Sequence, residues 1–263
     1  MFKTVMIKKL TTVPILVLFA TIMLCAQSHA RDAAQENLMN VLFLIVDDLN
    51  SWLLDDSNRY TGKVVTPNIS RLAESGVNFL HAYAASTVCT PSRTAVLSVI
   101  APWKSGIYNN SLVMDKSPAV RESFLLPELF KKAGFYTVGS GKINHGYKLD
   151  RSVWDERMNH NRESVPPGAP LNGWAKGRDG KVTSKDRGAS HQPKEEINDW
   201  RYTDFAIKQL QKDHEKPFFI ACGILRPHNP WYAPQEHSDL YPLAEIAIPE
   251  IKEDDLSDVP SLD

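Results

Sequence analysis

The chain has 263 residues, of which 43% are hydrophobic and 23% charged, and its formal net charge is −1 at pH 7. This composition is that of an ordinary globular protein, which excludes disorder over the whole length. The lack of a basic excess argues against nucleic acid as a partner.

The first thirty residues have the features of an export signal. Lys3, Lys8 and Lys9 make a basic start, the apolar run 10–25 follows, and the small residues near Ala30 suit cleavage. The run falls short of the roughly 20 apolar residues that a spanning helix needs. We therefore expect a cleaved signal peptide over 1–30, no stable membrane insertion, and an exported domain over 31–263, periplasmic or secreted.

The segment 40–46 is a continuous run of apolar, mostly branched residues, which predicts a strand buried on both faces of a parallel sheet. A helix is predicted to begin at Thr66-Pro67 and to end at Gly76. A short strand is expected over 77–80.

The same order recurs twice further along the chain. A helix over 125–133 precedes a strand over 135–138, and a helix over 199–214 precedes a strand over 217–221. Strands that alternate with helices predict an α/β fold with a mostly parallel sheet, whose ligand sites gather at the carboxyl ends of the strands. Cys222, at the end of the last run, is expected to be a buried strand residue.

Between Asp150 and Glu196 the alternation stops, and Gly, Pro, Lys, Asp and Ser dominate. We expect a loop-rich insertion over about 150–196. A loop of this length is consistent with the rim of a substrate pocket or with a solvated excursion, and both interpretations stay open.

Four polar clusters follow predicted strands or begin a helix: Asp47-Asp48, Cys89-Thr90-Pro91-Ser92-Arg93, Gly141-Lys142 with His145, and Arg226-Pro227-His228. Adjacent carboxylates gain from a shared cation, and hard oxygen ligands suit calcium or magnesium. A solvated strand end is the alternative interpretation of the Asp pair.

Pro91 fits the first turn of a helix, so backbone N–H groups and the helix dipole would favour an anion beside Cys89. Arg93 adds a planar fork that matches sulfate or phosphate oxygens, and Lys142 adds a point charge. Taken singly, each residue is equally explained as a surface charge or a small core cysteine. Their joint occurrence favours an anion site.

The segment Cys89-Thr90-Pro91-Ser92-Arg93 resembles the C-x-P-S-R signature of type I sulfatases, in the alkaline phosphatase superfamily. The Asp pair, Gly141-Lys142 with His145, and Arg226-Pro227-His228-Asn229-Pro230 resemble the family in order and context, and are most similar to iduronate-2-sulfatases. The resemblance covers residues 40–245. It implies a three-layer sandwich around a mostly parallel sheet, and a sulfated carbohydrate as substrate.

By the same resemblance, Cys89 is oxidised to formylglycine by a formylglycine-generating enzyme, and its hydrated aldehyde supplies the nucleophilic oxygen. Asp47 and Asp48 would bind one Ca²⁺ together with the modified Cys89.

The remaining polar side chains also receive roles from the resemblance. Arg93 and Lys142 would hold the sulfate charge. His228 would be the general acid and His145 would contact the formylglycine.

Two departures from the family matter. After the cysteine motif the family has Leu-x-Thr-Gly, where this chain has Leu97-Ser98-Val99-Ile100. The family also carries a second pair of metal ligands and a further lysine well downstream, which are not found before Asp263. We therefore expect the chain to be a fragment or a truncated product with the fold incomplete at its C-terminus.

Three alternatives remain at this stage. One is a phosphate or phosphonate ester hydrolase of the same superfamily, since the anion site alone scarcely separates tetrahedral oxyanions. Another is a truncated, non-catalytic binder of sulfated glycans. The third is a hydrolase that uses Cys89 as a thiolate with His145 or His228.

Overall fold

The computed structural model describes residues 38–54, 60, 62–146, 152–161, 165–172, 185–248 and 251–259. Its centre is a four-stranded, all-parallel sheet of order β1-β5-β2-β3. These strands are β1 (Val41–Val46), β2 (Tyr136–Gly141), β3 (Glu156–Asn159) and β5 (Phe218–Ile224). The expected signal peptide lies outside the described residues.

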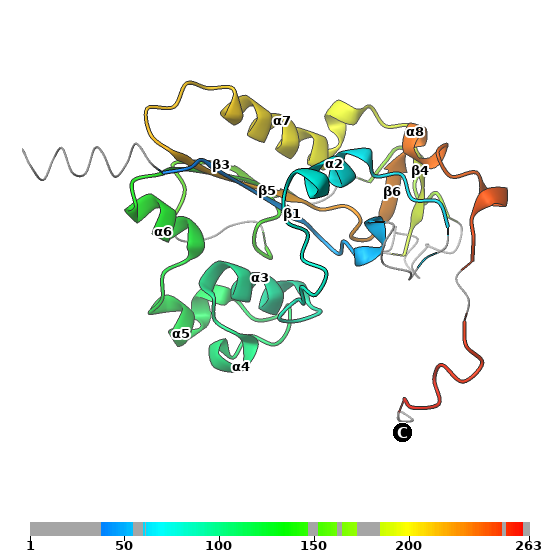
Figure 1. Cartoon of the computed structure of the whole chain (residues 1–263), viewed down its shortest axis with the longest axis horizontal. Coiled ribbons are helices and arrows are strands. Elements are labelled where there is room, and N and C mark those ends of the chain that lie inside the picture. Colours follow the sequence, from blue (N-terminus) through cyan, green and yellow to red (C-terminus); the bar gives the residue numbers. More distant parts are fainter. Residues whose placement is uncertain are drawn as a thin grey trace, which may run out of the picture.

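Helices cover both faces of the sheet, which confirms the three-layer arrangement (Figure 1). On one side lie α2 (Pro67–Ser75) and α7 (Asn198–Leu210). On the other lie α3 (Cys89–Ser98), α4 (Pro102–Ser105), α5 (Pro118–Arg121) and α6 (Leu126–Lys132). Short 3₁₀ turns span Ser51–Leu53, Met114–Lys116, Lys194–Glu196 and Leu243–Glu245.

Two apolar clusters join these layers. The larger lies between the sheet and α3, α5 and α6, where the rings of Phe219 and Phe130 stack with centroids 4.2 Å apart. The smaller lies under α7 and contains Val138, Tyr202 and Ile220, each with no exposed surface. The strands β2 and β5 are therefore buried on both faces, as their continuous apolar runs predict.

The prediction that the first strand is buried on both faces is wrong. Leu42 and Leu44 of β1 are 44% and 49% exposed, whereas Val41, Phe43 and Ile45 pack on the larger cluster. Among the described strands β1 is at the edge of the sheet, and α7 packs over β2 and β5 instead. An apolar run shows what a strand is able to bury, while its place in the sheet decides what it does bury.

The prediction of a short strand over 77–80 is also wrong. The helix before it is present, but the segment that follows is irregular, and Val77, Phe79 and Leu80 are each more than 60% exposed. A strand needs a partner for its backbone N–H and C=O groups, and none of the described strands pairs with this segment.

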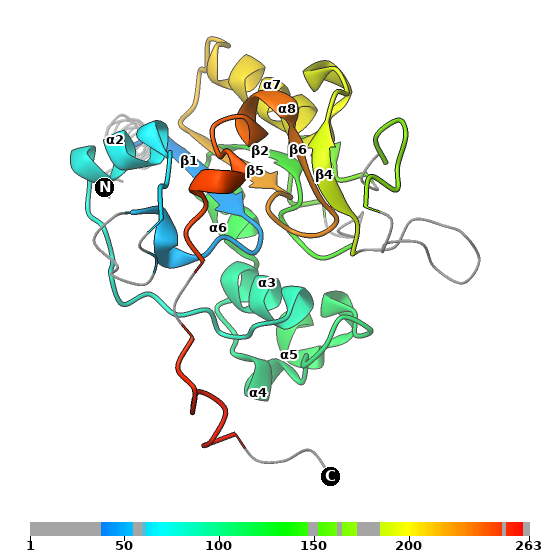
Figure 2. The ribbon, with the colours of Figure 1, turned by 90° about the vertical axis from the view of Figure 1, so that its right-hand side faces the viewer.

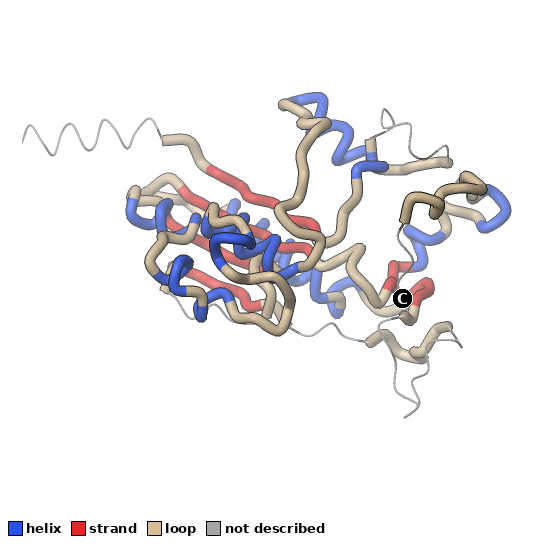
Figure 3. The backbone as a smooth tube through the Cα atoms, turned by 90° about the horizontal axis from the view of Figure 1, so that it is seen from below, coloured by secondary structure: helices blue, strands red, loops and turns tan. Residues whose placement is uncertain are grey.

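The loop-rich segment 150–196 contains two strands that its composition does not predict. One is β3, which extends the main sheet. The other is β4 (Arg187–Ser190), which pairs with β6 (Trp231–Pro234) in a small parallel sheet next to α8 (Gln235–Ser238). Figure 3 shows these two strands apart from those of the main sheet.

The carboxyl ends of β1, β5 and β2 meet at one edge of the main sheet, because all pairings are parallel. Figure 2 looks onto this edge, with α3 below the sheet and α7 and α8 above it. None of the helices in the described ranges is long and apolar enough to cross a membrane.

Candidate active site

Three strand ends and one helix start bring the predicted residues together. Asp47 follows β1, Lys142 follows β2, His228 lies beyond the end of β5, and Cys89 is the first residue of α3. One ligand atom each of Asp47, Cys89 and His228 lies within 4.8 Å of the others. Residues 181 positions apart in the chain thus face one another.

Cys89 is held at the positive end of a helix. Val88 before it is extended, and the N–H groups of the first helical turn point towards the start of α3. Asn110 Oδ1 accepts the N–H of Thr90 at 2.8 Å, which pins this turn from the following loop. The Cys89 side chain is half-buried and faces a pocket of about 350 Å³.

Asp47 is buried between two cations. Arg93 Nη2 donates to Asp47 Oδ1 at 2.6 Å, and Lys142 Nζ donates to Oδ2. Burial by itself would raise the pKa of Asp47, but the hydrogen bonds and charges of Arg93 and Lys142 outweigh it and lower the pKa. The carboxylate is therefore ionised, and both of its oxygens are engaged.

The backbone also fixes Arg93. Its Nη1 donates to the carbonyl oxygens of Lys142 at 2.5 Å and Ile143 at 3.1 Å. The fork of Arg93 therefore ties α3 to the turn after β2, a role that its resemblance to a sulfate-binding arginine does not indicate.

Two glycines allow that turn to form. Gly141 has φ 66°, and a Cβ there would lie 2.1 Å from Gly223 O, while a Cβ on Gly223 would lie 2.0 Å from Lys142 O. The N–H of Lys142 donates to Gly223 O at 2.9 Å. The close approach of β2 and β5 at their ends places Lys142 in the site, and Gly223 is a residue that sequence reasoning missed.

Cys89 is an unusually acidic thiol. Hydrogen bonds with His145 and then His228, together with the charge of Lys142, lower its pKa to about 6, although burial opposes this. Lys142 Nζ lies 3.8 Å from Cys89 Sγ. The contact with Cys89 raises the pKa of His228 in return. The site thus favours a negative group at position 89.

His228 is positioned through its own backbone. Arg226 Nη1 donates to His228 O at 2.9 Å, and Asp199 accepts the N–H groups of Leu225 at 2.7 Å and Arg226 at 2.9 Å. Asp199 is a positioning residue that sequence reasoning missed. Its place in the first turn of α7 was the available signal.

The remaining predicted residues are less enclosed. The His145 side chain contacts the Cys89 thiol but is mostly exposed. Asp48 is exposed, has φ 55°, and lines the same pocket as Asp47 and Cys89. Two carboxylates and an oxygen at position 89 form a donor set that fits one hard divalent cation. Such a cation would have to share Asp47 with Arg93 and Lys142.

Comparisons with known proteins find similar sequences. The family model described as "Sulfatase" matches residues 39–250. A sulfatase of Formosa agariphila is 35% identical over 232 residues, which are 84% of this chain and 45% of that protein. Iduronate 2-sulfatase of Mus musculus is 30% identical over 244 residues, which are 88% of this chain and 42% of that protein.

Solved structures give the same fold. A phosphonate monoester hydrolase of Agrobacterium radiobacter matches 80% of this chain and 45% of its own, with a TM-score of 0.56 and 16% identity. A protein solved in complex with D-glucosamine-2-N,6-O-disulfate matches 81% of this chain and 39% of its own, with a TM-score of 0.55 and 22% identity. The chain spans less than half the length of these relatives.

Proposed function

The chain belongs to the sulfatase family, and from this premise we propose that it carries the nucleophile side of a sulfuric ester hydrolase that removes sulfate from a sulfated sugar. The observation that supports the proposal most is the convergence of Asp47, Cys89 and His228 within 4.8 Å. Arg93 and Lys142, both buried, add two cations to the same place. Two buried cations beside the nucleophile position suit the hydrolysis of a sulfate ester, which releases the sulfate dianion.

Cys89 is the proposed nucleophile position, in the form of formylglycine made by a formylglycine-generating enzyme after or during export. The hydrated aldehyde supplies an oxygen nucleophile in place of a thiol. The position suits such an oxygen, because the N–H groups of α3 and the ammonium group of Lys142 surround it with positive charge.

Asp47, Asp48 and the oxygen at position 89 are the proposed ligands of one Ca²⁺. The ion would supply charge that offsets the developing oxyanion. Arg93 and Lys142 are the proposed sulfate-binding cations. Lys142 donates to Asp47 and lies 3.8 Å from Cys89 Sγ, so its ammonium group is close to the negative charge that would develop at position 89.

His228 is the proposed general acid. A sugar alcohol leaves poorly unless its oxygen is protonated. A ring nitrogen of His228 lies within 4.8 Å of the Cys89 sulfur and of an Asp47 oxygen, beside the position where the leaving group would form. His145, which contacts the Cys89 thiol from the exposed side, is the proposed second partner of the group at position 89.

The proposed substrate class is inferred from the relatives of the chain. An iduronate-2-sulfatase-like specificity, for a 2-sulfated uronic acid in a glycosaminoglycan or similar polysaccharide, is our proposal from the Mus musculus protein and the motif pattern. Export to the periplasm or the medium belongs to the same proposal.

The test compares turnover of an aryl sulfate and the matching aryl phosphate by the parent protein, by Cys89→Ala and by Cys222→Ala as the matched cysteine control. We expect calcium-dependent release of sulfate that Cys89→Ala abolishes and Cys222→Ala retains. Faster turnover of the phosphate ester would replace sulfate with phosphate in the proposal. Equal activity of parent and Cys89→Ala would end it.

A second candidate follows from the acidic thiol. With a pKa of about 6 and two histidine contacts, an unmodified Cys89 would be a thiolate at neutral pH and able to attack an acyl or ester carbon. Mass spectrometry of the peptide that contains Cys89 separates the two, because formylglycine and cysteine differ in mass and only the thiol reacts with iodoacetamide.

A further inference from the structure

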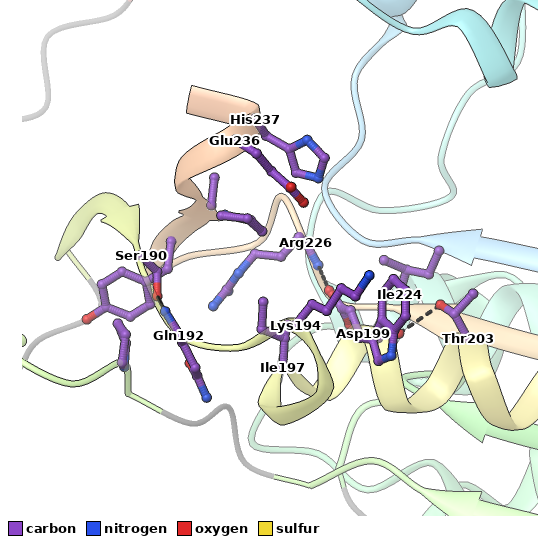
Figure 4. Close-up of a pocket in the computed structure, with 15 residues that line it drawn as sticks. Ser190, Gln192, Lys194, Ile197, Asp199, Thr203, Ile224, Arg226, Glu236 and His237 are labelled. Carbon is purple, nitrogen blue, oxygen red and sulfur yellow. Dashed lines mark hydrogen bonds between the residues drawn. The ribbon is translucent and has the colours of Figure 1, made fainter. Parts of the chain in front are cut away.

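A second pocket, of about 320 Å³, opens on the other face of the same sheet edge (Figure 4). It lies between the small sheet, the first turns of α7 and helix α8. Its charged and aromatic lining consists of Lys194, Asp199, Trp200, Arg226, Tyr232, Glu236 and His237. None of these residues lines the pocket at Cys89.

Two cation–aromatic pairs line this pocket. Lys194 Nζ lies 4.5 Å from the centre of the Trp200 ring, and the Arg226 guanidinium lies 5.7 Å from that of Tyr232. The Tyr232 hydroxyl donates to Asp186 at 2.6 Å, which fixes its ring. Trp200 is 43% exposed. An exposed indole next to two cations suits a ligand with an apolar face and anionic groups, such as a charged sugar ring.

The charged side chains that can contact a ligand in this pocket are mostly cationic. Asp199 also lines the pocket, but its carboxylate oxygens accept the backbone N–H groups of Leu225 at 2.7 Å and Arg226 at 2.9 Å. That leaves Lys194 and Arg226 beside the carboxylate of Glu236. In Figure 4 the Arg226 side chain extends into the pocket between Gln192 and Glu236.

The pocket is coupled to the site at Cys89 through one short segment. Arg226 lines the pocket, and its Nη1 donates to the carbonyl of His228, the proposed general acid. The guanidinium therefore lies against the backbone of that residue, 2.9 Å from its carbonyl oxygen. A ligand that contacts Arg226 is held next to the segment that carries the proposed general acid.

We infer that this pocket binds the anionic sugar residue adjacent to the one that loses its sulfate, with Trp200 against the ring and Lys194 and Arg226 on its sulfate or carboxylate. The inference rests on the proposed function and deepens it. The substrate is then a charged oligosaccharide, recognised over at least two residues.

The experiment measures binding by calorimetry in the Cys89→Ala background, so that no probe is consumed. The probe is a disaccharide of 2-sulfated uronic acid and 6-sulfated glucosamine, with the unsulfated disaccharide as comparison. Trp200→Leu and Lys194→Gln should each weaken binding of the sulfated probe about 10-fold. The matched controls are Trp103→Leu and Lys104→Gln on α4, across the sheet, which should leave its affinity unchanged.

A second measurement uses the enzyme with Cys89 intact. The ratio of kcat/KM for the disaccharide to kcat/KM for an aryl sulfate should fall about 10-fold in Trp200→Leu. Unchanged affinity in both pocket variants, or equal affinity for the unsulfated disaccharide, overturns the inference. If either of these outcomes is found while the parent protein still hydrolyses aryl sulfate, the inference fails and the proposed function stands. If binding depends on the pocket but no sulfate is released, the proposed function fails instead.

Discussion

The two pockets at the carboxyl edge of the sheet differ in how their charges are held. At the Cys89 pocket, Asp47, Arg93 and Lys142 are at most 6% exposed and contact one another directly. At the Arg226 pocket, Lys194, Glu236 and His237 are exposed and come from a 3₁₀ turn and a four-residue helix.

This difference separates two tasks. A reacting centre requires groups fixed within fractions of an ångström, and buried contacts between strand ends and α3 provide that. A pocket that only holds a neighbouring sugar tolerates looser side chains on surface segments. Substitutions in the Cys89 pocket should therefore affect kcat and folding, whereas those in the Arg226 pocket should affect KM.

The largest effect is expected from His228→Gln. Loss of the general acid should lower kcat for a sulfated sugar about 10³-fold. The loss should be smaller for an aryl sulfate whose leaving phenol needs no proton. His237→Gln, in the other pocket, should instead raise KM for the disaccharide a few-fold.

Both variants are assayed under steady-state conditions on both substrates. An equal loss on the aryl sulfate and the sugar would remove the acid role from His228. A fall in kcat for His237→Gln would remove the distinction between the two pockets.

The next-largest effect is expected from Asp47→Asn, on the free energy of unfolding measured in urea. It leaves Arg93 and Lys142 buried and without their shared counter-charge, which should cost about 3 kcal/mol. Glu236→Gln removes a negative charge from the exposed pocket and should change stability by less than about 0.5 kcal/mol. Similar values for the two variants would show that burial of the Asp47 cluster contributes little to the fold.

The clustering of the candidate site residues was predictable where they follow strands. Asp47, Lys142 and His228 come after β1, β2 and β5, and parallel strands must bring such residues to one edge. The apolar runs that predict those strands are long and bounded, so the edge could be located from the sequence alone. The start of α3 at Cys89 was predictable from Pro91.

The pairing within the site was not predictable. Nothing in the sequence shows that both oxygens of Asp47 accept from cations while the next residue, Asp48, is exposed. Which of the two aspartates meets the cations depends on side-chain torsions and on the approach of Gly141 to Gly223. The exposed face of β1 was missed for a related reason, because periodicity describes one strand and coverage depends on its neighbours.

Cys89 and Cys222, the cysteines of the described residues, are expected to differ in reactivity in protein prepared without the formylglycine-generating enzyme. Iodoacetamide reacts with thiolate, so alkylation of Cys89 should rise with pH, reach half its plateau near pH 6 and stay level above pH 7. Cys222 is buried, and burial raises its pKa, so it should stay unmodified in the folded protein. Labelled peptides quantified against pH, with Cys222→Ala as control, give the profile. A midpoint near 8.5, the value of a free thiol, would show that His145 and His228 do not contact Cys89.

The smallest effect is expected from Asp199→Asn, which joins the two pockets. The amide keeps one acceptor for the N–H of Leu225 or Arg226 but sets an NH₂ group against the other, which should cost about 1 kcal/mol of unfolding free energy. The pKa of Asp199 is raised by burial, so the parent carboxylate itself becomes costlier as pH rises through that pKa, and the difference between parent and variant should narrow at high pH. Because Arg226 contacts both the second pocket and the His228 carbonyl, kcat and KM for the disaccharide should change together in this variant. A change in only one of them would mean that the segment 225–228 does not couple the two pockets, and that each is held by its own layer of helices.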